Sequence, residues 1–153
     1  MRKAAFVVLA GLAANFAALS ATAAPSAETV FREFDLFGRF ATHCDQPATP
    51  ENPHVSVSAP GNGAVLEEQD VGSQFAINRY RVLTAKRLSD TRLAVTVVFQ
   101  AGAQDQERQR LEYLVGKGTR RTIFNQPEGG EVRVKNGVAI AIGLATPVLR
   151  KCE

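Results

Sequence analysis

Apolar residues fall on every second position over much of the chain beyond residue 37. The clearest case is 92–100, where Leu93, Val95, Val97 and Phe99 alternate with other residues. Successive side chains of a strand point to opposite faces, so this spacing predicts a half-buried β-strand. The pattern predicts nine or ten short strands, the others lying at 38–44, 54–58, 64–69, 75–85, 111–115, 119–125, 131–135, 138–142 and 148–152.

Turn-forming residues separate these strands at hairpin-like intervals. Gly61-Asn62-Gly63 follows a proline, and Gly116-Lys117-Gly118 lies between two apolar runs. Asn136-Gly137 is the pair favoured by type I′ hairpins, because both central residues need a positive φ. Within 75–85 the apolar positions change side between Ile77 and Tyr80, which indicates a bulge there. The sequence therefore predicts an all-β antiparallel domain, and we favour a small barrel over a β-sandwich because a barrel has no unpaired edges.

The segment before the first strand has a different pattern. In residues 24–37, Val30, Phe31, Phe34 and Phe37 are at near-helical spacing. This segment is expected to be a short helical or irregular lead-in to one domain at 38–153.

Residues 1–23 have the three parts of a secretory signal peptide. Arg2 and Lys3 supply positive charge, residues 4–19 form an uncharged apolar run, and Ala21 and Ala23 fit a cleavage site after Ala23. The run is shorter than the ~20 apolar residues of a membrane span. We expect a cleaved signal, with the mature protein soluble in the periplasm or secreted, and without a stable membrane anchor.

Cleavage also changes the charge of the chain. The full sequence has 18 Lys and Arg against 15 Asp and Glu, a formal net charge of +3. Without Arg2 and Lys3 the balance becomes 16 against 15. A nearly neutral domain gives no reason to expect a nucleic-acid partner.

Two cysteines, Cys44 and Cys152, remain after cleavage. In an oxidising compartment an even pair in a small domain is most simply one disulfide. The alternative is a nucleophilic or metal-binding thiol. A bridge would hold the first and last strands together, as closure of a barrel requires, and the closed loop would stabilise the fold by roughly 4–5 kcal/mol in the chain-entropy model.

Gly38-Arg39-Phe40 resembles the start of lipocalin-like barrels, in which Gly-x-Trp opens the first strand. The longer Gly-Arg-aromatic-Ala-x-x-Cys opening, which ends at Cys44, is similar to that of a group of uncharacterised small exported proteins of Gram-negative bacteria. The stretches 125–130 and 149–153 resemble the same group. The barrel resemblance implies a closed antiparallel fold, and it allows the role of periplasmic metalloprotease inhibitors, which share this barrel type.

Catalytic chemistry finds no support in the residue pattern. There is no Gly-x-Ser-x-Gly motif, and the histidines, His43 and His54, are both close to the first strand. With Cys44 and Asp45 they are the nearest approach to a metal cluster, but structural zinc needs four ligands in a closed set. Paired carboxylates such as Glu67-Glu68 point to opposite faces of a strand and are expected to be solvated. We predict no catalytic residue, no metal site and no cofactor.

Eight arginines between positions 79 and 121 are expected on a solvated outer surface, although an anion-binding face is the alternative. They are Arg79, Arg81, Arg87, Arg92, Arg108, Arg110, Arg120 and Arg121.

The sequence leaves binding as the expected function, in a non-enzymatic domain with an unknown partner. That partner would be a small apolar ligand inside the barrel or a periplasmic protein docked through loops such as 46–53, and the alternative is an inhibitor of an exported protease. Strand residues that form the core or line a ligand cavity, which alternation cannot distinguish, are Phe40, Leu93, Val95, Val97, Phe99, Leu111 and Tyr113.

Overall fold

The computed structural model describes residues 24–153, so the signal peptide expected at 1–23 lies outside the described residues. One helix, α1 (Ala27–Glu33), precedes the strands. The strands are β1 (Gly38–Ala41), β2 (His54–Gly61), β3 (Ala64–Asp70), β4 (Asn78–Arg87), β5 (Arg92–Phe99), β6 (Glu107–Gly116), β7 (Thr119–Pro127), β8 (Val134–Lys135), β9 (Val138–Ala139), β10 (Leu144–Ala145) and β11 (Leu149–Lys151).

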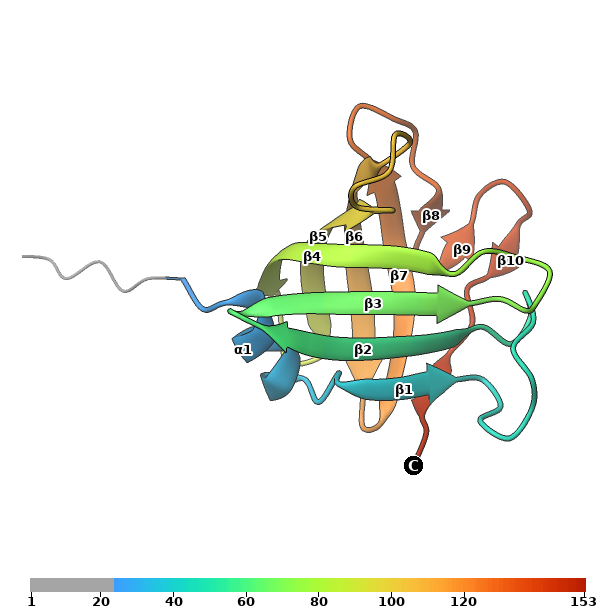
Figure 1. The fold of residues 1–153 in the computed structure, drawn as a ribbon, viewed down its shortest axis with the longest axis horizontal. Coiled ribbons are helices and arrows are strands. Elements are labelled where there is room, and N and C mark those ends of the chain that lie inside the picture. Colours follow the sequence, from blue (N-terminus) through green and yellow to red (C-terminus); the bar gives the residue numbers. More distant parts are fainter. Residues whose placement is uncertain (1–23) are drawn as a thin grey trace, which may run out of the picture.

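Eight of these strands close an antiparallel barrel (Figure 1). Strands β1 to β7 each pair with the next along the chain, and β11 closes the ring by pairing with β7 on one side and β1 on the other. The register at closure places Leu149 opposite Arg120 and Lys151 opposite Phe40. The prediction of a small lipocalin-like barrel, rather than a sandwich, is confirmed.

Strand β4 differs from its expected form. It begins at Asn78 rather than at residue 75, and its register shift lies between Val82 and Thr84 instead of between Ile77 and Tyr80. Phe75 is 56% exposed in a turn in which its N–H donates to the Gly72 carbonyl over 3.0 Å. Residues 75–77, which alternation assigned to a strand, therefore lie before β4 and not within it.

Helix α1 packs against the barrel at the end that carries the β2–β3 turn. Ser26 caps the helix by accepting from the Thr29 N–H at 3.1 Å. The Glu28 N–H donates to the Gly63 carbonyl, and an ion pair of 3.0 Å joins Glu33 to Arg87 on β4. At seven residues, α1 is too short to cross a bilayer, and no other helix lies in 24–153.

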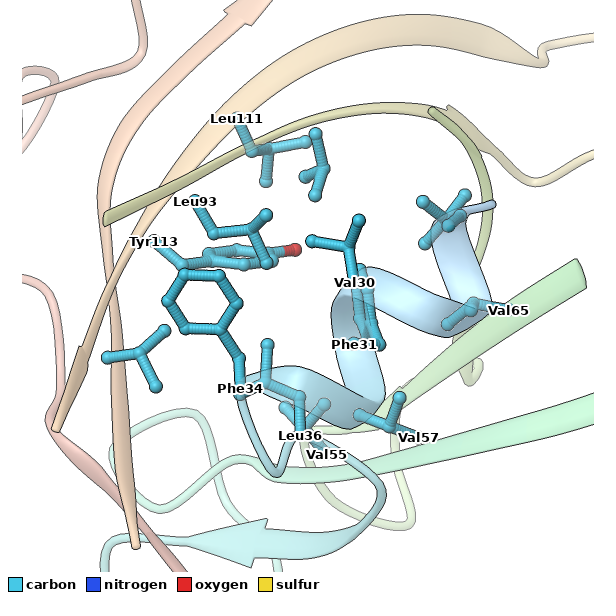
Figure 2. Close-up of a cluster of buried hydrophobic side chains, with 14 of the residues drawn as sticks. Val30, Phe31, Phe34, Leu36, Val55, Val57, Val65, Leu93, Leu111 and Tyr113 are labelled. Atoms are coloured by element: carbon cyan, nitrogen blue, oxygen red, sulfur yellow. The ribbon is translucent and has the colours of Figure 1, made fainter. Parts of the chain in front are cut away.

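The apolar side of α1 fills one part of the barrel interior. Val30 and Phe31 are at most 1% exposed, and they point toward strand residues such as Val65 and Leu93 (Figure 2). The segment expected as a lead-in is therefore helical, as its spacing indicated, and it belongs to the hydrophobic core.

The disulfide Cys44–Cys152 is present, with 5.6 Å between the two Cα atoms. It follows β1 and β11 in the chain, and the Cys152 N–H donates to the Arg39 carbonyl at 2.7 Å. The predicted bridge between the first and last strands is thus confirmed.

Beyond the ring, β8, β9 and β10 continue the sheet from β7 as a short extension (Figure 1). Asn136 and Gly137 have φ angles of 52° and 73°, which confirms the predicted hairpin between β8 and β9. The segment expected as one strand at 138–142 ends early, because a turn after Ala139 leads into β10. Several apolar side chains of this extension are exposed, namely Val138, Ile140, Ile142 and Leu144.

Candidate functional site

An ion pair lies inside the barrel between Glu67 of β3 and Arg120 of β7. Each residue is 4% exposed. Arg120 Nη1 donates to Glu67 Oε1 at 3.1 Å, and Nη2 donates to Oε2 at 2.9 Å. The Tyr113 hydroxyl donates to Oε2 at 3.2 Å. The carboxylate therefore accepts three hydrogen bonds in a place where water is largely excluded.

The guanidinium of Arg120 also contacts two aromatic rings. Its central carbon lies 4.3 Å from the centre of the Tyr113 ring and 5.7 Å from that of Phe40. Burial is the largest single effect and opposes the charged form, but attraction to the Glu67 carboxylate, together with the contribution of Tyr113 and the hydrogen bonds to both groups, raises the pKa of Arg120 overall. Arg120 is a fixed positive charge held by one carboxylate.

Strand parity explains why Glu67 is internal. Val65 and Glu67 are buried on one side of β3, whereas Leu66 and Glu68 alternate with them on the exposed side. The expectation that Glu67 is solvated is wrong, and so is the expectation that Arg120 belongs to the outer surface. Glu68 does face outward, where it pairs with Arg79 at 2.9 Å.

A cavity of about 210 Å³ adjoins this ion pair. Antiparallel strands alternate in direction, so the β1–β2 connection lies at the end of the barrel opposite the β2–β3 turn and α1. Pro53 of that connection lines the cavity, and no α1 residue among 27–33 does. The lining combines apolar and polar side chains from several strands: Pro53, Val55, Glu67, Gln69, Tyr80, Leu111, Tyr113, Arg120, Arg121, Thr122, Asn125, Val134, Thr146, Pro147 and Leu149.

Both tyrosines of the chain, Tyr80 and Tyr113, line this cavity, and the sequence has no tryptophan. Burial, with the charge of Glu67, raises the pKa of Tyr80 to about 12. Burial and the same carboxylate raise the pKa of Tyr113 further. The phenols are neutral, and their surroundings oppose an added negative charge.

Strand β11 is only three residues long, so the connection before it, residues 146–148, covers part of the barrel wall beside the cavity. We call this connection the seam. The Thr146 hydroxyl donates to the Thr122 carbonyl of β7 at 2.6 Å and accepts from Arg121 Nε at 3.0 Å. Arg121 Nη2 also donates to the Gly137 carbonyl at 2.6 Å. A Cβ at Gly137 would lie 2.8 Å from the guanidinium and would push it out of these hydrogen bonds, and the φ of 73° favours glycine independently.

A second set of polar side chains continues from the cavity wall. Asn125 Nδ2 donates to Gln109 Oε1 at 3.0 Å, and Gln109 Nε2 donates to Glu107 at 2.6 Å. Glu107 pairs with Arg133, whose hydrogen bonds lower the pKa of the carboxyl group. Asn125 Oδ1 is buried and has no partner within residues 24–153. The interior is therefore polar on this side over more than the central ion pair.

The structure divides the predicted lining residues into two groups. Leu111 and Tyr113 line the cavity. The others do not: Phe99 packs against Tyr80 with 5.1 Å between ring centres, and the remaining four are buried in the core to within 2%, namely Phe40, Leu93, Val95 and Val97. These four belong to the packed core, whereas Phe99 lies behind Tyr80 of the cavity wall. The sequence analysis missed the polar lining residues.

The region around the first loop is occupied by structural contacts. Cys44 is taken up by the disulfide, and across residues 24–153 no three His, Cys, Asp or Glu side chains are grouped as metal ligands. Asn52, which is 5% exposed, secures the loop 46–53 by accepting from the His43 N–H at 2.8 Å and donating to the Pro47 carbonyl at 3.0 Å. The loop reaches the cavity through its last residue, Pro53.

Comparisons with known protein families, curated proteins and solved structures found no match to this chain. The cavity and its lining are therefore the features from which a function can be inferred. An interior with one neutralised ion pair, two protonated phenols and apolar walls is suited to enclosing a small molecule.

Proposed function

We propose that this chain is an exported, non-enzymatic binding protein that holds a small molecule in the cavity beside Glu67 and Arg120. The observation that carries the proposal is the cavity itself, which lies inside a closed barrel and combines apolar walls with a few convergent polar groups.

The internal ion pair supports binding over a purely structural interior. Replacing a buried ion pair by apolar residues of similar volume is often neutral or stabilising, by ~1–4 kcal/mol. A barrel selected for stability alone would gain little from Glu67 and Arg120. A ligand in the cavity could form hydrogen bonds with the charged and phenolic groups at its wall, which would explain their presence.

Export is part of the proposal. The N-terminal 23 residues have the form of a cleaved signal, and the Cys44–Cys152 disulfide is typical of an oxidising compartment such as the periplasm.

Native mass spectrometry of the protein purified from periplasm tests the proposal. We expect a bound small molecule that is lost when the protein unfolds. In a Leu111→Trp variant the much larger indole should obstruct the cavity and abolish the adduct. Leu114→Trp is the matched control, because Leu114 lies on the same strand but is 42% exposed. An adduct absent from the wild-type protein, or equal in both variants, would contradict the proposal.

A protein partner is the second candidate, favoured by the exposed apolar residues of the β8–β10 extension, such as Ile140 and Ile142. Inhibition of an exported protease is one such role. Titration of a periplasmic protease with the purified domain tests it, and full protease activity at stoichiometric excess would refute it.

A further inference from the structure

The size of the cavity limits what it can hold. A cavity of ~150 Å³ lined by apolar side chains can bind benzene, and drug-sized ligands need ~300–1,000 Å³. At about 210 Å³, this cavity lies between the two. It suits a molecule of about one ring.

Among residues 24–153, the wall of the cavity offers no unpaired carboxylate, and its one guanidinium without a carboxylate partner, that of Arg121, lies at the margin. Glu67 and Arg120 neutralise each other through two hydrogen bonds. Arg121 adds a positive charge at the margin, but its guanidinium is held at the seam by the Gly137 carbonyl and the Thr146 hydroxyl. A cation that left water for this site would lose hydration without gaining a partner of opposite charge, and an anion would meet only Arg121, whose Nε and Nη2 already donate to the Thr146 hydroxyl and the Gly137 carbonyl.

Uncharged polar groups also line the cavity, among them Thr122, Asn125 and Thr146. Tyr80 brings a phenol hydroxyl, and Gln69 brings an amide on the same side of β3 as Glu67. The raised pKa of Tyr80 keeps that hydroxyl protonated, so that it can donate as well as accept a hydrogen bond. Apolar side chains, among them Val55, Leu111 and Leu149, form much of the remaining wall.

We infer that the ligand is an uncharged molecule of about one ring, with an apolar body and a single hydroxyl or amide group that meets Tyr80 and Gln69. The inference rests on the proposed binding function and adds the chemical class of the ligand.

Four simple compounds test size and charge separately: cyclohexanol, cyclohexanecarboxylate, cyclohexylammonium and cyclododecanol. None of them absorbs where tyrosine does, and both tyrosines line the cavity, so tyrosine fluorescence of the wild-type protein reports binding without a tryptophan background. At about neutral pH, cyclohexanol should bind at least about tenfold more tightly than either ion, because an unpaired buried charge is costly. Cyclododecanol should bind more weakly than cyclohexanol because it exceeds the cavity.

A single substitution should change the preferred charge. Glu67→Gln keeps the shape of the side chain and leaves Arg120 without its carboxylate, so cyclohexanecarboxylate should bind at least about tenfold more tightly than to the wild type. Glu68→Gln is the matched control, because Glu68 is the neighbouring residue with its side chain 52% exposed, and it should leave all four affinities unchanged. If Glu67→Gln fails to fold, the wild-type series decides the inference.

The outcomes separate the ligand class from binding itself. If either ion binds as tightly as cyclohexanol, the inferred class is wrong while the proposed function stands. The same holds if none of the four compounds binds although the native protein carries a small-molecule adduct. If no compound binds and no adduct is found, both the inference and the proposed function fail.

Discussion

The barrel interior has two parts that are built from the same strands and differ in chemistry. Around α1 the side chains are apolar and tightly buried, as with Phe31 and Leu93 (Figure 2). Away from α1, Glu67 and Arg120 meet beside a cavity. Strand β3 contributes Val65 to the first part and Glu67 to the second.

This difference in chemistry indicates which part of the interior stabilises the fold. Removing apolar surface from water is the main source of stability, and α1 provides it by closing one part of the barrel. The cavity part contains charges that stabilise little and space that no side chain fills. We assign stability to the helix-filled part and binding to the cavity part.

The largest expected effect is in the helix-filled part. Phe31→Ala should lower the free energy of unfolding by about 4 kcal/mol, because Phe31 is fully buried and its loss leaves a void. Urea unfolding followed by circular dichroism measures it. Phe75→Ala is the control, since Phe75 is 56% exposed, and it should change stability by less than about 0.5 kcal/mol. Equal losses of unfolding free energy in the two variants would contradict a stabilising role for α1.

The second prediction concerns the cavity part, where a second substitution should restore the stability that the first one removes. Arg120→Met should cost about 3 kcal/mol, because it leaves the Glu67 carboxylate buried and unpaired. Adding Glu67→Leu should restore most of that loss, since no unpaired charge then remains buried at this place. The same unfolding experiment measures both variants. A double variant no more stable than Arg120→Met alone would mean that the ion pair itself stabilises the barrel.

The sequence predicts the apolar part of the interior but not the polar part. The alternation of Leu93, Val95 and Val97 gave the strands their buried side, and the barrel followed from the turns and the two cysteines. Glu67 could not be placed, because Val65 and Leu66 are both apolar and favour opposite faces of β3. Leu66 is 37% exposed in the structure.

Arg120 posed the same difficulty in another form. The four residues 119–122 are all polar, so no apolar neighbour marks the inner face of β7 there. Its partner is 53 residues away in sequence, and only the pairing of the strands around the barrel brings the two together. The site therefore depends on register and closure, which residue spacing does not contain.

A pH titration gives the third prediction. Tyr80 has a pKa of about 12 in the folded protein, above its ordinary value near 10, and that of Tyr113 is higher still. Protonated phenols thus contribute stability that is fully present below pH ~10 and is lost as the pH rises through about 12. Tyrosinate absorbance should stay low in the folded protein at pH ~10 and appear at once on unfolding in urea. Ionisation of both tyrosines near pH ~10 in the folded state would contradict the burial of the cavity wall.

The smallest effect concerns the seam. Thr146→Val removes the hydroxyl that donates to the Thr122 carbonyl and accepts from Arg121, and it should cost roughly 1 kcal/mol. Hydrogen exchange should become faster at the amide groups of β11 and remain unchanged in α1. Uniform acceleration over the barrel would show that the seam is not a separate weak point.

The most direct test of the central claim is the site at which a small neutral molecule binds. Cyclohexanol added to isotope-labelled wild-type protein should shift the NMR signals of cavity residues, above all Tyr80, Leu111 and Leu149, and leave those of Phe31 on α1 unchanged. Shifts centred on α1, or on the exposed β8–β10 extension with none in the cavity, would contradict the account.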